Sequence, residues 1–217
     1  PYVGSTAFAH KGGMHVNAVQ KVAHSFEHIE PGSVGNKQRI LVSDLSGQSN
    51  ILMKAEEFGI DLAKGSDEAK AILADLKELE QEGYEFEAAE ASFELLIRKH
   101  LATYKPFFDL QEYHCTYRRD GLKDYDVCSA TVELKVNDTE EYRVAKGDGP
   151  VNALDAALRK ALRPHFPEID EMELSDYKVR IIDSRSGTAA KTRVLIESKA
   201  GNETWGTVGV SDNIIQA

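Results

Sequence analysis

The chain has few cysteines and no long apolar run. Cys115 and Cys128 are its only cysteines among 217 residues, which gives neither a disulfide framework nor a Cys-x-x-Cys pair for zinc. Two buried thiols would account for them, and a disulfide or redox pair is the alternative. Cysteine scarcity is typical of a reducing compartment, so we predict a cytoplasmic protein. No apolar stretch approaches the roughly 18 to 20 residues that cross a bilayer, so we expect no membrane partner.

Basic residues are also in short supply. The chain has 26 Lys and Arg against 36 Asp and Glu, a formal net charge of -10, and no basic cluster. Nucleic-acid binding draws on a basic face that releases counterions, so we expect no nucleic-acid partner. No basic region followed by an apolar run marks a secretory signal. Because the chain starts at Pro1 and stops within an apolar pattern, we expect it to be part of a longer polypeptide.

Helical patterns dominate the first half. They predict a helix over residues 5–22, interrupted by Gly12 and Gly13, a short strand over 39–44, and helices over 51–58, 66–83 and 87–101. Ser66 is the expected N-cap of the third helix and Gly83 its end. We predict a linker subdomain at residues 1–45, a helical subdomain at 46–105, and a regulatory domain at 106–217.

Beyond Pro106 the apolar residues recur with a period of two residues instead of a helical period. Ala130, Val132, Leu134 and Val136 alternate with polar residues, as in a half-buried strand. We expect strands near 108–115, 129–136 and 141–145, a loop over 118–124 and a helix over 151–162. Strands near 177–182, 194–196 and 204–210 and a helix starting at Ser211 repeat this order. An offset of 63 residues places Tyr142 on Trp205. The prediction is an α+β fold: helical linker subdomains, then two βββα units, the last helix truncated.

Two histidines near the start are candidates for chemistry. His10 and His15 are five residues apart, a spacing that does not put both on one helical face, and no acid or cysteine lies in a zinc-like register. We therefore predict no metal site. One reactive histidine beside Gly12 and Gly13 is a functional interpretation, because histidine transfers protons near neutrality. A solvated or structural histidine is the alternative.

The segment "GDGPVNAL" joins a predicted strand to a predicted helix. It lacks the Gly-Lys-Ser/Thr ending of a phosphate loop, but its free N–H groups at a helix N-terminus could bind a carboxylate. The glycines could also simply form a tight turn. A second such turn at Ser211, Asp212 and Asn213 would give a pair suited to a small zwitterion.

Several motifs together resemble the 2-isopropylmalate synthase and citramalate synthase group. They are "AFAHKGGMHVNAV", "EPGSVGN", "RILVSDLSGQSN", "GDGPVNALDAAL", "GTAAKTRVLIES" and "WGTVGVSDNII". The resemblance covers nearly the whole chain, and "HKGGMHVNAVQK" is most similar to the citramalate synthase branch. It implies a homodimeric acyltransferase whose N-terminal TIM barrel holds a divalent metal and condenses a 2-oxo acid with acetyl-CoA. That barrel is absent from this chain, so we expect no cofactor in it and no activity by itself.

The resemblance also implies site residues. His15 corresponds to the histidine implicated in deprotonating acetyl-CoA, and Phe26 falls where the family commonly has a tyrosine, so a hydroxyl is missing there. Feedback inhibition by isoleucine or leucine implies an effector site in the C-terminal domain. Its expected residues are Gly147, Asp148, Gly149, Pro150, Val151, Asn152, Leu154, Gly187, Thr188, Ala189 and Asp212.

Two other functions are compatible with the residues. A structural dimerisation module without a ligand would keep the fold but respond to no amino acid. An autonomous enzyme using His10 and His15 would show activity with an added metal.

Overall fold

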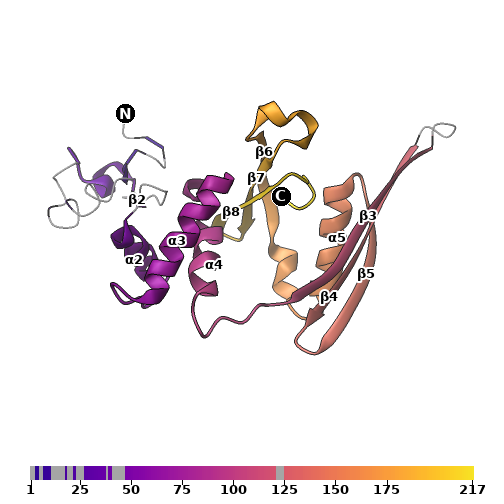
Figure 1. The fold of residues 1–217 in the computed structure, drawn as a ribbon, viewed down its shortest axis with the longest axis horizontal. Helices are drawn as coiled ribbons and strands as arrows, with labels where there is room; N and C mark the ends of the chain where they lie inside the picture. Colours follow the sequence, from indigo (N-terminus) through magenta and orange to yellow (C-terminus); the bar gives the residue numbers. More distant parts are fainter. Residues whose placement is uncertain are drawn as a thin grey trace. The chain divides into compact units, whose positions relative to one another are not determined.

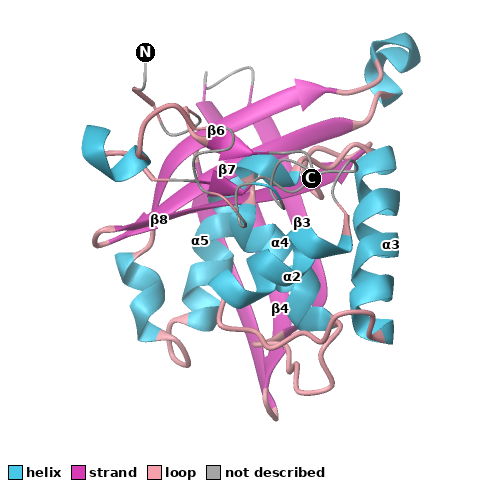
Figure 2. Ribbon diagram, turned by 90° about the vertical axis from the view of Figure 1, so that its left-hand side faces the viewer, coloured by secondary structure: helices cyan, strands magenta, loops and turns pink. Residues whose placement is uncertain are grey.

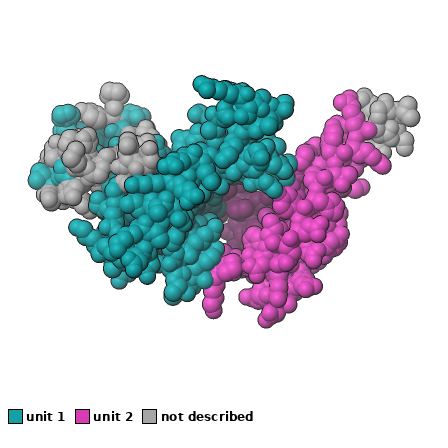
Figure 3. Space-filling model, in the orientation of Figure 1, with its two compact units in different colours: residues 1–104, 176–197, 205–217 teal, residues 105–175, 198–204 magenta. Residues whose placement is uncertain are grey.

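A computed structural model describes residues 3–4, 7–10, 18, 22, 27–37, 39–40, 47–120 and 125–217. Its contacts divide the chain into two compact units (Figure 3). Unit 1 contains Pro1–Tyr104, Asp176–Glu197 and Trp205–Ala217, and unit 2 contains Lys105–Ser175 and Ser198–Thr204. The domain bounds predicted from the sequence stay predictions.

From residue 47 to residue 104, which the structure describes without a gap, unit 1 contains three α-helices and a short 3-10 turn. They are α2 at Gln48–Glu57, α3 at Asp67–Glu82, η3 at Phe86–Ala88 and α4 at Glu90–Lys99 (Figure 1). The Ser66 hydroxyl accepts the Ala69 N–H at the start of α3, and Gly83 ends it with a φ of 109°. Both caps were predicted from the sequence. The positive φ at the C-cap explains Gly83, since only glycine adopts this backbone without strain.

Apolar faces of these helices meet in one core. Phe86 and Phe93 pack edge to face with ring centroids 5.9 Å apart, and each buried side chain of this size contributes roughly 1.5 to 3 kcal/mol. Val208, far along the chain, packs against the same cluster. The buried members are Ile51, Ala55, Ile60, Ile72, Leu76, Phe86, Phe93 and Ile97.

The beginning of the chain corrects one prediction. Within the expected helix over 5–22, Ala9–His10 instead form a two-residue strand, β1, that pairs in parallel with β2 at Arg39–Ile40. The pairing joins segments about 30 residues apart, which a local helical pattern cannot show. Most other residues of that expected helix, and residues 41–44 of the expected strand, lie outside the described residues. Pro31–Val34 form the short helix η2.

Unit 2 is built on an antiparallel sheet in the order β3-β4-β5. Its strands are β3 at Asp109–Asp120, β4 at Tyr125–Val136 and β5 at Thr139–Gly147, followed by α5 at Pro150–Leu162 and η4 at Pro167–Glu171. Helix α5 packs on one face of this sheet (Figure 1, Figure 2). There, alternate residues of β4 meet Ala153, Ala157 and Ala161. The helix and the period of two are confirmed.

Strands β3 and β4 are longer than the sequence predicted. Residues 118–120, expected in a loop, pair with residues 125–127 as part of the sheet. Cross-strand contacts extend the ladder there, because the Tyr117 hydroxyl donates to Asp126 at 2.8 Å. The predicted loop was therefore too long at its start.

A second three-stranded sheet follows in the order β6-β7-β8. Its strands are Glu173–Ile181, Thr192–Ala200 and Glu203–Ser211, with the 3-10 segment η5 at Ser184–Ala189 between the first two. The repeated element order and the α+β class are confirmed. The β4–β5 and β7–β8 hairpin turns each contain a residue with positive φ, Asn137 (53°) and Gly201 (56°). These two residues occupy equivalent positions, so the two repeats are offset by 64 residues in the structure. The predicted offset of 63 was wrong by one residue, which matters because one step exchanges the two faces of a strand.

The end of the chain corrects the predicted helix at Ser211. Residues 212–217 form turns and no α-helix, although the Ala217 N–H donates to the Asn213 carbonyl at 3.1 Å, as in one helical turn. A first turn fixes several dihedral angles for a single hydrogen bond and is therefore unfavourable by itself.

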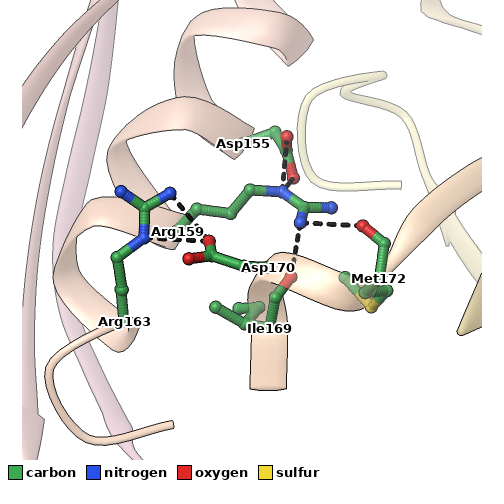
Figure 4. Close-up of polar contacts among 6 residues, drawn as sticks. All are labelled: Asp155, Arg159, Arg163, Ile169, Asp170 and Met172. Atoms are coloured by element: carbon green, nitrogen blue, oxygen red, sulfur yellow. Dashed lines mark hydrogen bonds and ion pairs between the residues drawn. The ribbon is translucent and has the colours of Figure 1, made fainter. Parts of the chain in front are cut away.

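An arginine network joins α5 to η4 within unit 2 (Figure 4). Arg159 pairs with Asp155 one helical turn away at 2.9 Å and donates to the carbonyls of Ile169 (2.7 Å) and Met172 (2.9 Å). These bonds fix the chain that leads from α5 to the second sheet.

Candidate effector site

The first predicted turn lies in unit 2, between β5 and α5. Gly149 is the N-cap of the helix, with extended backbone, and Pro150 occupies the first helical position, where its missing N–H costs nothing. The Asp148 N–H donates to the Asn152 side chain at 3.1 Å. This bond fixes the turn directly before the helix.

The start of α5 has the electrostatic character of an anion site. The N–H groups of Val151 and Asn152 lie in the first turn, where an α-helix supplies no acceptor of its own. The helix dipole adds partial positive charge there, and the first turn contains no acidic residue. Val151 and Asn152 are both exposed, so the start of the helix lies at the surface.

Gly147 has a packing role in the same turn. A Cβ atom added to Gly147 would lie 2.5 Å from the Ala153 nitrogen and 2.6 Å from the Asn152 Oδ1 atom. Any side chain there would push β5 away from α5. The close approach of strand and helix therefore accounts for this glycine, whether or not a ligand binds.

The second predicted turn lies in unit 1, after β8. The Ser211 hydroxyl accepts the Asn213 N–H at 3.0 Å, and the Asn213 side chain accepts the Ile215 N–H at 3.0 Å. At the structural offset of 64 residues, Asp212 is the equivalent of Asp148, a match that the predicted offset missed. Both aspartates are exposed.

The small loop around Gly187 also lies in unit 1. Gly187 has φ 58° and ψ -125°, a conformation that is essentially restricted to glycine. Asp183 starts the loop by accepting from the Ser186 hydroxyl (2.7 Å) and the Arg185 N–H (3.2 Å), and these hydrogen bonds lower the pKa of its carboxyl. Thr188 and Ala189 are exposed. The loop is thus shaped by its own turn chemistry.

The predicted effector residues fall into two groups. Gly147, Asp148, Gly149, Pro150, Val151, Asn152 and Leu154 belong to unit 2, and Gly187, Thr188, Ala189 and Asp212 belong to unit 1. Within unit 2, the seven residues form one continuous turn and helix start. Leu154 is partly buried against the core, two residues after Asn152.

The predicted catalytic residues His15 and Phe26 lie outside the described residues. Next to Phe26 in sequence, Glu27 is buried and lies 3.0 Å from the Nε2 atom of His10. Sequence reasoning assigned no partner to His10 and did not single out Glu27. Their side chains are 10% and 6% exposed, which supports a structural role for His10.

The described residues contain no group of three or more His, Cys, Asp or Glu side chains placed to hold a metal ion. Two pockets lie apart from the predicted turns. One, of about 240 Å³, is lined by residues of the β3-β4-β5 sheet, including Glu112, His114 and Tyr142. The other, of about 250 Å³, is lined by residues of unit 1, including Lys178 and Arg180. In the part of the chain that the structure describes, no helix is long and apolar enough to cross a bilayer.

Comparison with known proteins places these features in a family. The family described as "LeuA allosteric (dimerisation) domain" matches residues 87–217, and the family described as "Homocitrate synthase post-HMGL domain-like" matches residues 2–84. The first match covers both sheets, α4, α5 and every predicted effector residue.

Individual relatives agree with this family. The chain is 52% identical to an (R)-citramalate synthase of Aquifex aeolicus over its whole length, which is 41% of that relative. It is also 52% identical to an (R)-citramalate synthase of Synechocystis, all of the chain matching 40% of that relative. A 2-isopropylmalate synthase of Bacillus thuringiensis is 29% identical over 99% of the chain and 40% of its own length. The chain thus spans about two fifths of these relatives, and it belongs to the LeuA allosteric (dimerisation) domain family as a regulatory and linker part of the citramalate synthase and 2-isopropylmalate synthase group.

Proposed function

We propose that this chain senses a branched-chain amino acid, isoleucine or leucine, and as part of a homodimer controls an acyltransferase to which it is joined. The observation that carries the proposal is the match of residues 87–217 to an allosteric dimerisation domain, which includes the exposed residues at the start of α5.

Different residues suit the carboxylate, the ammonium group and the side chain of an amino acid. The N–H groups of Val151 and Asn152 suit the carboxylate, because helix N-termini attract anions. The exposed carboxylates of Asp148 and Asp212 suit the ammonium group, and Leu154 contributes apolar surface. Asp148 and Asp212 lie in different units. Each of them is therefore a separate candidate for binding the ammonium group.

The chemistry of the whole protein is part of the same proposal. A TIM barrel would hold the divalent metal and condense acetyl-CoA with a 2-oxo acid, pyruvate in a citramalate synthase. His15 would act as the base toward acetyl-CoA, and Phe26 would supply no hydroxyl at the position where the family commonly has a tyrosine. By itself the chain would be inactive.

Inhibition in this proposal is a coupling free energy between the effector site and the barrel. Such couplings are typically about 1 to 3 kcal/mol, or roughly 5- to 150-fold in affinity. His15, matched to the catalytic base, and the effector residues lie on one chain. An effector that binds better to an inactive arrangement of the linker would therefore lower the population of the active arrangement.

Calorimetric titration of the chain with isoleucine and leucine tests the proposal. We expect Val151→Asp to weaken binding by at least about tenfold, because a new carboxylate would repel the ligand's carboxylate at the helix start. Val144→Asp is the matched control, since Val144 is 51% exposed on β5 and Val151 is 46% exposed. Binding that both variants reduce equally would contradict the assignment to α5.

A purely structural dimerisation module is the second candidate, favoured by the packing of Gly147 against Ala153. It predicts a dimer by light scattering and no heat with any amino acid. A dimer that binds isoleucine or leucine would exclude it.

A further inference from the structure

The only two cysteines of the chain lie side by side in unit 2. The Sγ atoms of Cys115 on β3 and Cys128 on β4 are 3.5 Å apart, and both are free thiols. Cys115 lies opposite Ala130 and Cys128 opposite Tyr117, so they are diagonal neighbours. Both pack in the core between the sheet and α5.

The two thiols differ in access. Cys128 is 3% exposed, whereas Cys115 is only partly buried. Burial and the hydrogen bond with Cys128 raise the pKa of the Cys115 thiol. A partly buried thiol next to a fully buried one favours an order of reaction in which a reagent first reaches the less buried thiol and the other then completes the exchange.

From this geometry we propose that Cys115 and Cys128 form a reversible disulfide within the chain by exchange with a small disulfide of the glutathione type. The Cys115 thiolate attacks one sulfur of oxidised glutathione, and one glutathione thiolate leaves. The Cys128 thiolate then attacks the Cys115 sulfur of the mixed disulfide and releases the second glutathione. Two protein thiols are oxidised, one disulfide is reduced to two thiols, and the protons pass to solvent and to the leaving thiolates.

The bond requires a local change in the sheet. A disulfide joins residues whose Cα atoms are usually about 4.4 to 6.8 Å apart, whereas diagonal residues of an antiparallel pair have their Cα atoms roughly 7 to 8 Å apart. Strands β3 and β4 must therefore shift toward each other, and a bond formed against such a shift is more easily reduced. The diagonal position of the two cysteines therefore makes the disulfide reversible.

The shift reaches the start of α5. On its other side, Cys128 pairs with Gly147 of β5, the residue that has no room for a Cβ atom beside Ala153. We therefore expect oxidation to change the packing beneath the first turn of α5, whatever that turn binds.

Intact-mass measurement of the folded chain incubated with oxidised glutathione tests the proposal. The exchange is run at about pH 8.5, where more of the thiol is ionised. We expect the main product to have lost two hydrogen atoms, to migrate as a monomer without reductant, and to return to the starting mass with dithiothreitol.

Two variants identify the order of the steps. In Cys128→Ala the second thiol is missing, so the glutathione adduct at Cys115 should accumulate. In Cys115→Ala the buried Cys128 should stay unmodified. Circular dichroism verifies that each variant is folded. A stable glutathione adduct on the unaltered chain, disulfides only between chains, or oxidation only after denaturation would each overturn the proposal.

Discussion

At the scale of single residues, Gly147 and Gly149 lie in the same turn but face different surroundings. A Cβ atom on Gly147 would lie 2.5 Å from the Ala153 nitrogen, whereas one on Gly149 would have no neighbour within 4 Å. Gly147→Ala must therefore move β5 or α5, and we expect a loss of roughly 1 to 3 kcal/mol of stability. Thermal or urea denaturation measures the change.

Gly149→Ala is the control for that prediction. Its backbone is extended, so alanine fits, and the expected cost is the few tenths to about 1 kcal/mol that an alanine N-cap loses. Equal destabilisation by both substitutions would show that the contact with Ala153 does not constrain the turn.

At the scale of elements, Arg159 is the residue that fastens η4 to α5. Its side chain is 22% exposed and donates to the carbonyls of Ile169 and Met172. Arg159→Met leaves those acceptors without this donor, and we expect a loss of roughly 1 to 3 kcal/mol. Chemical denaturation followed by circular dichroism gives the value.

Arg163 provides the matched comparison on the same helix. Its ion pair with Asp170 joins side chains that are 57% and 49% exposed, and exposed pairs contribute at most about 1 kcal/mol. Arg163→Met should therefore cost less than Arg159→Met. The reverse order would contradict the role given to Arg159.

The sequence predicted elements well where local chemistry marks their ends. Helix α3 has both signals, since Ser66 caps its start and Gly83 ends it. Helix α4 was expected from residue 87 but begins at Glu90, because η3 occupies the preceding turn. Strand β1 was mistaken for part of a helix, because its partner β2 is distant in sequence. Strand ends depend on cross-strand pairing, which a single segment does not reveal.

The candidate site was predictable to the same degree. The sequence "GDGP" predicts its turn and helix start. The equivalence of Asp148 and Asp212 in the two repeats, in contrast, depends on the offset of 64 residues, which the two hairpin turns define. The buried pair of His10 and Glu27 joins residues 17 apart without any periodic pattern.

At the scale of the whole molecule, unit 1 brings together segments far apart in the chain. The Val208 N–H on β8 donates to the Ser92 hydroxyl on α4 at 2.9 Å, across 116 residues. A Cβ atom on Gly206 would lie 1.9 Å from the Ala88 carbonyl oxygen. The second sheet is thus fitted closely to the helices that precede the first sheet.

Ser92→Ala tests this long-range contact. The substitution removes the acceptor of a partly buried N–H, so we expect a loss of roughly 1 to 3 kcal/mol in unfolding experiments. Ser33→Ala, which removes an exposed hydroxyl bonded to the Glu30 carbonyl, should change stability by about 0.5 kcal/mol or less. A Ser92 variant as stable as the Ser33 variant would show that β8 and α4 are not held by this bond.

The central claim is that the chain binds a branched-chain amino acid in its folded state. A ligand that binds only the folded chain raises the melting temperature, and the rise grows with ligand concentration as the logarithm of 1 + [L]/Kd. A thermal-shift titration with isoleucine, leucine, valine and unrelated amino acids therefore tests the claim most directly. The account predicts a rise with isoleucine or leucine that grows with their concentration, and none with the unrelated amino acids. An unchanged melting temperature with every amino acid, in a chain shown to be folded and dimeric, would contradict it.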